Sequence, residues 1–163
     1  SQQAEVSPAD LDRMFDAFIE HYAATIADAS RPFPGLVPAL DHLASHGFIF
    51  AVCTNKLESL SHQLLQALDL TKRFAFICGQ DTFGVKKPDP HVLRLTIERA
   101  GGHIADAIMI GDSATDIDTA RAAGVPVIAV DFGYTEIPVA KLNPDRIISH
   151  FDALPAAVAD VRR

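Results

Sequence analysis

The chain lacks the features that mark nucleic-acid-binding, membrane and secreted proteins. Its 163 residues carry 14 Lys and Arg against 21 Asp and Glu, a formal net charge of −7, whereas proteins that bind nucleic-acid phosphates need clustered Lys and Arg. No apolar stretch approaches the roughly 20 residues of a membrane-spanning helix. The first ten residues are polar and have no apolar core of a secretory signal. We therefore expect a cytoplasmic protein with no nucleic-acid or membrane partner.

Cysteine is scarce, and neither glycine nor proline is enriched. The two cysteines, Cys53 and Cys78, lie inside apolar runs, which favours buried, reduced thiols over a disulfide framework. Nine Gly and 10 Pro, beside 48% hydrophobic residues, exclude a fibrous or disordered chain. The length leaves room for one domain with its own hydrophobic core.

Short apolar runs alternate with helical periodicities along most of the chain. The periodicities predict helices over residues 36–46, 57–68, 90–100, 117–123 and 154–161. Strands are predicted at residues 48–53, 74–78, 107–110, 125–130 and 146–148. The longer runs are apolar throughout, which is typical of strands covered on both faces. This order predicts an α/β fold in which helices wrap a Rossmann-like parallel sheet.

One further helix is predicted ahead of this alternation. Ser7 is a suitable N-cap, Pro8 suits the first helical position, and an apolar stripe with helical spacing then extends to about residue 29. The Pro- and Gly-containing segment 31–35 ends this helix. We expect residues 1–31 to form an element separate from the α/β core.

Polar side chains follow two of the predicted strands directly. Thr54 and Asn55 come after the strand at 48–53, and Asp112 follows the strand at 107–110. Ligands of open parallel sheets bind beyond the carboxyl ends of the strands. These side chains are therefore expected at one binding edge.

Two more charged residues are expected near the same edge. Lys87 lies in the segment GVKKPDP (84–90), directly before a predicted helix, and Asp116 follows Asp112 by about one helical turn. A hydroxyl and an ammonium can hold a phosphoryl group while a carboxylate binds the cation that neutralises its charge. Mg²⁺ needs only one or two protein carboxylates, with waters and phosphate oxygens completing its shell. The set predicts Mg²⁺-dependent phosphoryl transfer.

Three segments in this order resemble the signature motifs of a known superfamily. VCTNK (52–56), GVKKPDP (84–90) and MIGDSATDI (109–117) are similar to the second, third and fourth motifs of haloacid dehalogenase-like hydrolases. The similarity is greatest to the phosphoglycolate phosphatase branch and covers about residues 15–160. It implies a phosphatase that acts on a small phosphorylated metabolite.

The resemblance implies a role for each site residue. Thr54 would donate a hydrogen bond to a phosphoryl oxygen, with Asn55 beside it as a helper. Lys87 would hold the phosphoryl group and the charge of the nucleophile. Asp112 would ligate Mg²⁺, and Asp116 would support Lys87 or the metal shell.

The resemblance also implies an aspartate nucleophile that this chain does not show. In the family an apolar strand ends in an Asp-x-Asp-Gly-Thr-like stretch, whose first Asp becomes an aspartyl-phosphate and whose second is the general acid and base. The pair at 10–12 lies in the first turn of a predicted helix. The pair at 116–118 belongs to the fourth motif and points its carboxylates about 200° apart around the helix axis. Neither pair can serve.

The missing strand has consequences for the fold. In the family it lies between the strand that ends at Thr54 and the strand that ends at Asp112, so each should present an unpaired edge to a gap. Residues 1–31 would be the remnant of a helical cap, and residues 32–163 a core without its nucleophile strand. We expect a fragment that is inactive alone, with a homodimer through the unpaired edges as one way to fill the gap.

Other interpretations stay open at this point. A 2-haloacid dehalogenase-like hydrolase would share the motifs, although the Gly-Asp-Ser-x-x-Asp arrangement at 111–116 favours metal and phosphate chemistry. A truncated, non-catalytic binding or interaction module would explain the absent nucleophile. Locally, Thr54 could be a turn residue and Ser113 with Asp112 only a helix N-cap.

Overall fold

Parallel strands form two separate sheets in the computed structural model, which describes residues 13–162 apart from 15, 18, 22–24 and 26–29. In the first sheet β1 (Phe50–Cys53) pairs with β2 (Phe74–Cys78). In the second, β4 (Val127–Val130) lies between β3 (Met109–Gly111) and β5 (Arg146–Ile148). Every pairing is parallel, as the sequence predicts.

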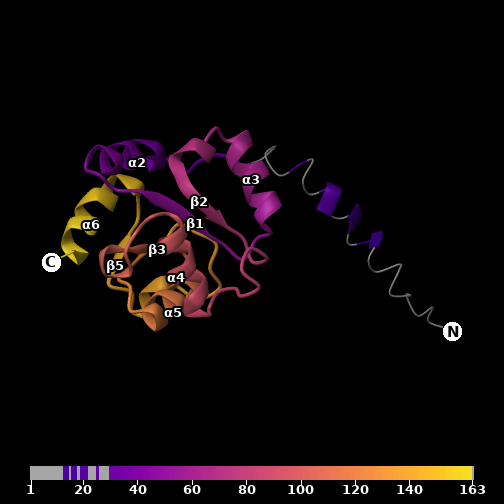
Figure 1. Ribbon diagram of the computed structural model, residues 1–163. Helices are drawn as coiled ribbons and strands as arrows, with labels where there is room; N and C mark the ends of the chain where they lie inside the picture. The colour runs from indigo at the N-terminus through magenta and orange to yellow at the C-terminus, as the bar shows by residue number, and fades with distance from the viewer. Residues whose placement is uncertain (1–12, 15, 18, 22–24, 26–29, 163) are drawn as a thin grey trace.

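Helices cover both sides of these strands (Figure 1). The helices that surround the strands are α2 (Leu36–Ser45), α3 (Glu58–Ala67), α4 (Pro90–Arg99), α5 (Ala114–Ala123) and α6 (Leu154–Val161). Helix α2 packs against α6, and α4 packs against α5. Figure 1 shows the first pair on one side of the strands and the second pair on the other. None of the described helices is long and apolar enough to cross a membrane.

The predicted α/β fold is confirmed, with small shifts at element ends. Strands β2 and β5 have the predicted bounds, whereas β1 begins at Phe50 instead of residue 48. Of the helix predicted over residues 7–29, the described residues 13, 14, 16, 17, 19–21 and 25 are helical, and the others lie outside the described part of the chain.

Strand β1 is less buried than its sequence predicts. All four residues of β4 are buried, but all four of β1 are only half-buried, and Ile49 just before it is 57% exposed. The expectation that the run at 48–53 is covered on both faces is therefore wrong for the chain as described. The cause is a missing neighbour on one side of β1.

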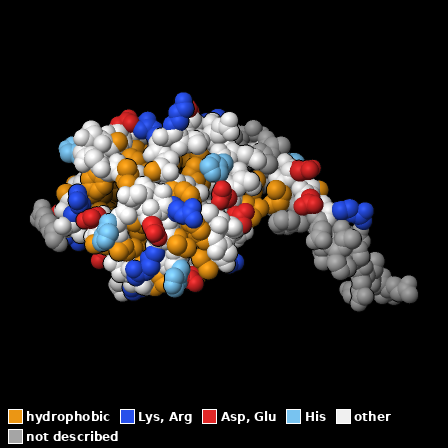
Figure 2. Space-filling model, in the orientation of Figure 1, with side chains coloured by type: hydrophobic (Ala, Val, Ile, Leu, Met, Phe, Trp, Pro, Cys, Tyr) orange, Lys and Arg blue, Asp and Glu red, His pale blue; other side chains and the backbone are white. Residues whose placement is uncertain are grey.

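An open groove of about 550 Å³ separates β1 from β3. Among the described residues β1 pairs only with β2, and β3 only with β4, so each has one unpaired edge, as predicted. The groove is lined by both strands and, from the surrounding helices, by residues that include Leu40 and Leu43 of α2, Leu93 and Ile97 of α4, and Leu154 and Val158 of α6. Apolar side chains also reach the surface in several patches among scattered charged ones (Figure 2).

The hydrogen-bond ladder shows which backbone groups face the groove. The Thr54 N–H donates to the Cys78 carbonyl, and the Met109 N–H donates to the Pro126 carbonyl. Residues of a parallel strand face its two neighbours alternately. The N–H and C=O groups of Cys53 in β1 and Ile110 in β3 therefore point away from β2 and β4, toward the groove.

Candidate active site

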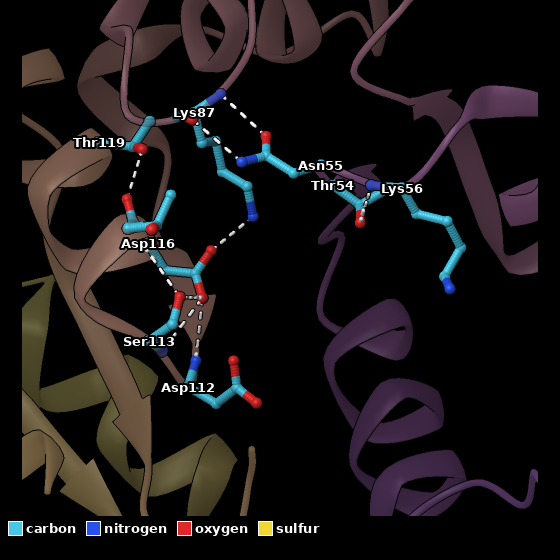
Figure 3. Close-up of polar contacts among 9 residues, drawn as sticks. Thr54, Asn55, Lys56, Lys87, Asp112, Ser113, Asp116 and Thr119 are labelled. Atoms are coloured by element: carbon cyan, nitrogen blue, oxygen red, sulfur yellow. Dashed lines mark hydrogen bonds and ion pairs between the residues drawn. The ribbon is translucent and has the colours of Figure 1, made fainter. Parts of the chain in front are cut away.

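The carboxyl ends of β1 and β3 lie at the same edge of the molecule (Figure 3). Thr54 follows β1, while Asp112 and Asp116 follow β3 at the start of α5. Lys87 comes from the loop between β2 and α4 and reaches Asp116. In Figure 3 Thr54 lies on one side of this edge, and Asp112 and Asp116 lie on the other.

Asn55 holds the backbone of Lys87. Its Nδ2 donates to the Lys87 carbonyl oxygen and its Oδ1 accepts the Lys87 N–H, both at 3.0 Å. The amide of Asn55 is therefore engaged in fixing the loop that carries Lys87. This contact could not be predicted from the sequence, because 32 residues separate the partners.

Lys87 and Asp116 form a buried ion pair. The Lys87 Nζ lies 2.5 Å from Asp116 Oδ1, and the two side chains are only 10% and 8% exposed. Lys87 is anchored on the β1 side by Asn55, whereas Asp116 belongs to the helix that follows β3. The ion pair therefore connects the part of the molecule that contains β1 to the part that contains β3.

Asp116 is fixed by the first turn of α5. Ser113 is the N-cap residue, and its hydroxyl accepts the Asp116 N–H while Asp116 Oδ2 accepts the Ser113 N–H, which completes a capping box. The same Oδ2 accepts the Asp112 N–H at 3.1 Å and the Ser113 hydroxyl at 2.8 Å. The N-cap interpretation of Ser113 is thus correct, and capping also orients Asp116 toward Lys87.

The surroundings of Asp116 keep it ionised. Burial alone would raise its pKa, but the charge of Lys87 and the hydrogen bonds from Lys87, Ser113 and the Asp112 backbone outweigh burial and lower the pKa below 3.8.

Thr54 and Asp112 project polar atoms that the protein does not fully use. The Thr54 hydroxyl oxygen accepts the Lys56 N–H at 3.1 Å, which leaves the hydroxyl proton for an acceptor. Asp112 Oδ2 accepts the Tyr134 N–H at 2.8 Å, and in Figure 3 the carboxylate points away from Asp116. The set can hold an anion and a cation side by side.

Cys53, at the end of β1, is unsuited to act as a nucleophile. Burial raises the pKa of its thiol to about 11, against the opposing effect of Lys87. The reactive thiolate is therefore nearly absent at neutral pH. Cys53 and Cys78 are both free thiols, as expected, but only Cys78 is fully buried and Cys53 is half-buried.

The residues fit a Mg²⁺ ion better than a transition metal. Among the described residues no group of three or more His, Cys, Asp or Glu could hold a metal, so Asp112 could contribute only a single carboxylate ligand. Mg²⁺ is typically bound by one or two carboxylates with waters and phosphate oxygens, so Asp112 suits that role only together with a substrate and a further ligand.

The sequence matches the family model of the haloacid dehalogenase-like hydrolases over residues 2–130. This chain belongs to that family. It is 49% identical over 160 residues to a phosphoglycolate phosphatase of Mesorhizobium japonicum, a match that covers 98% of this chain and 70% of the relative. A phosphoglycolate phosphatase of Agrobacterium fabrum is 46% identical, with 96% and 67% covered.

Solved structures agree with this assignment of the haloacid dehalogenase-like fold. A predicted phosphoglycolate phosphatase from Haemophilus somnus superimposes with a TM-score of 0.86 at 27% identity, over 93% of this chain and 68% of that one. This chain is therefore a phosphoglycolate phosphatase homologue that spans about two thirds of its relatives.

Proposed function

We propose that this chain forms most of the core of a Mg²⁺-dependent phosphoric monoester hydrolase for a small phosphorylated metabolite of the phosphoglycolate type. The observation that carries the proposal is the meeting of Thr54, Lys87 and Asp112 at one edge, with the buried Asp116 behind Lys87. The names of the two phosphoglycolate phosphatase relatives support the substrate class.

Each side chain has a distinct task in this proposal. The Thr54 hydroxyl donates to a phosphoryl oxygen, and the Lys87 ammonium offsets the charge on the phosphoryl group. Asp112 would hold Mg²⁺, which supplies further charge neutralisation when bound. Asp116 orients the Lys87 ammonium through their ion pair, and Asn55 fixes the Lys87 backbone.

The groove between β1 and β3 is the place for the nucleophile that the family resemblance implies. A parallel strand there would pair with the free edges of both neighbours, and its carboxyl end would emerge between Thr54 and Asp112. Attack of its Asp oxygen on phosphorus would form the aspartyl-phosphate and release the substrate alcohol, and water would then release phosphate. Residues 1–31 would be the remnant of a helical cap over this site.

A fusion tests the proposal. The part of the Mesorhizobium japonicum relative that lies outside the match is joined to Ser1, and hydrolysis of 2-phosphoglycolate is followed with and without Mg²⁺. We expect the fusion to be active only with Mg²⁺ and the chain alone to be at least about 10³-fold slower.

Variants of the fusion identify the site. Thr54→Val should lower kcat by about 10²-fold and Lys87→Met by about 10³-fold, the range for loss of a transition-state donor. Lys86→Met is the matched control, because its neighbour Lys87 alone makes the ion pair with Asp116, and it should change kcat little. Equal activity of the chain alone, or halide release from 2-haloacids in place of phosphate release, would contradict the proposal.

A further inference from the structure

The loop after β4 is anchored at its beginning. The Asp131 N–H donates to the Ile148 carbonyl, and the Ser149 hydroxyl donates to Asp131 Oδ2 at 2.6 Å. The ring of Phe132 packs edge-on against Phe151, with centroids 5.2 Å apart. These contacts fix the backbone that leads to Gly133 and Tyr134.

Gly133 lies directly against Asp112. A Cβ atom at residue 133 would come within 2.7 Å of Asp112 Cγ, and still nearer to other atoms of that side chain. Its backbone does not have a positive φ that only glycine favours. Glycine is therefore needed here for space: any side chain would push the Asp112 carboxylate away.

The next amide fixes one oxygen of that carboxylate. The Tyr134 N–H donates to Asp112 Oδ2 at 2.8 Å, whereas none of the described residues donates to Oδ1. The ring of Tyr134 is 89% exposed, so the contact with Asp112 is made by the backbone. Asp112 thus offers Oδ1 as its free ligand atom.

We propose that the Gly133–Tyr134 backbone positions Asp112 as a one-oxygen ligand and thereby favours Mg²⁺ over Ca²⁺. Mg²⁺ requires a compact octahedral shell, whereas Ca²⁺ takes six to eight oxygens and often both oxygens of one carboxylate. The amide on Oδ2 disfavours the two-oxygen mode. This inference rests on the proposed role of Asp112 as a Mg²⁺ ligand.

Paramagnetic broadening by Mn²⁺ measures the effect without any catalysis. Amide signals of residues 111–113 are recorded in the fusion with inorganic phosphate present during Mn²⁺ titration, and Mg²⁺ or Ca²⁺ is then added in competition. In the unsubstituted fusion Mg²⁺ should restore the signals at a lower concentration than Ca²⁺. Gly133→Ala should weaken Mn²⁺ binding about tenfold or more, as loss of a partner that orients a ligand does.

Three further variants distinguish the effect of the Gly133–Tyr134 backbone on metal binding from side-chain effects and from general effects of replacing glycine. Gly102→Ala is a matched glycine replacement whose Cβ would meet only Ile97, and it should leave Mn²⁺ binding unchanged. Tyr134→Ala keeps the N–H and should also bind normally. Tyr134→Pro removes the N–H, and the preference for Mg²⁺ over Ca²⁺ should shrink while the fold, checked by circular dichroism, persists.

The inference is overturned if Gly133→Ala in the fusion binds Mn²⁺ normally, if Tyr134→Ala is as damaged as Gly133→Ala, or if the unsubstituted fusion with phosphate binds no Mn²⁺ or does not distinguish Mg²⁺ from Ca²⁺. The fusion assay keeps the two proposals apart. Hydrolysis by the fusion with no effect of Gly133→Ala on metal binding rejects only this inference. The expected metal behaviour without hydrolysis rejects only the proposed function.

Discussion

Strands β1 and β4 have similar sequences and different surroundings. Both are short runs of apolar residues, FAVC and VIAV. Strand β4 has a paired neighbour on each side and is buried throughout, whereas β1 has one and is half-buried throughout. An apolar strand of this kind is suited to burial on both faces. The sequence of β1 is therefore that of an inner strand, although it forms an edge in the described chain.

The largest effect on stability is expected from loss of the ion pair between Lys87 and Asp116. Asp116→Ala removes the only carboxylate in the ion pair of Lys87 and leaves a buried ammonium. We expect the free energy of unfolding to fall by about 3–5 kcal/mol, as measured by urea denaturation. Asp118→Ala on the same helix is the control, because its pair with Arg121 is 57–60% exposed and should contribute less than about 1 kcal/mol. Equal losses would show that the link is not structural.

A matched pair of valines tests the strand comparison itself. Val127 in β4 is 3% exposed, whereas Val52 in β1 is half-buried. Val127→Ala should cost about 2 kcal/mol and Val52→Ala about 1 kcal/mol or less, because the cost follows the volume lost from a closed core. In the fusion, where the groove is filled, the cost of Val52→Ala should approach that of Val127→Ala. If Val52→Ala cost as much as Val127→Ala in the chain alone, β1 would not be an edge strand.

The pH dependence gives a smaller effect at the same link. The pKa of Asp116 is lowered in the folded protein from its ordinary value of 3.8. Its ionised form therefore stabilises the fold above about pH 4, and this stabilisation is lost as the pH falls through the lowered folded pKa. Between pH 5 and pH 3 the native chain should lose more stability than Asp116→Asn in urea denaturation. Parallel losses would show that the pKa is not lowered.

Much of this architecture could be predicted from the sequence, because local patterns determine it. The bounds of β2 and β5 follow from apolar runs, and the N-cap at Ser113 follows from the capping residue itself. The gap beside β1 was expected from the family resemblance, which implies a strand at that place. The half-burial of β1 could not be predicted from its own apolar residues, because the burial of a strand depends on its neighbours in the sheet.

The candidate site was likewise predicted only in part from the sequence. Lys87 and Asp116 could be placed at one edge, but which partner Asp116 supports was left open. Asn55 hydrogen-bonds the backbone of Lys87, which lies 32 residues away in the sequence. The Tyr134 N–H donates to Asp112, which lies 22 residues away. Any residue but proline can supply such groups, so the sequence carries no signal for them.

The central claim is that β1 and β3 present free edges to a groove. Amide hydrogen exchange in the chain alone tests this claim most directly. Thr54 and Met109 donate to neighbouring backbone carbonyls, whereas the amides of Cys53 and Ile110 face the groove. We predict slow exchange at Thr54 and Met109 and fast exchange at Cys53 and Ile110, followed by NMR. Slow exchange at all four amides would show that the edges are paired and would contradict the account.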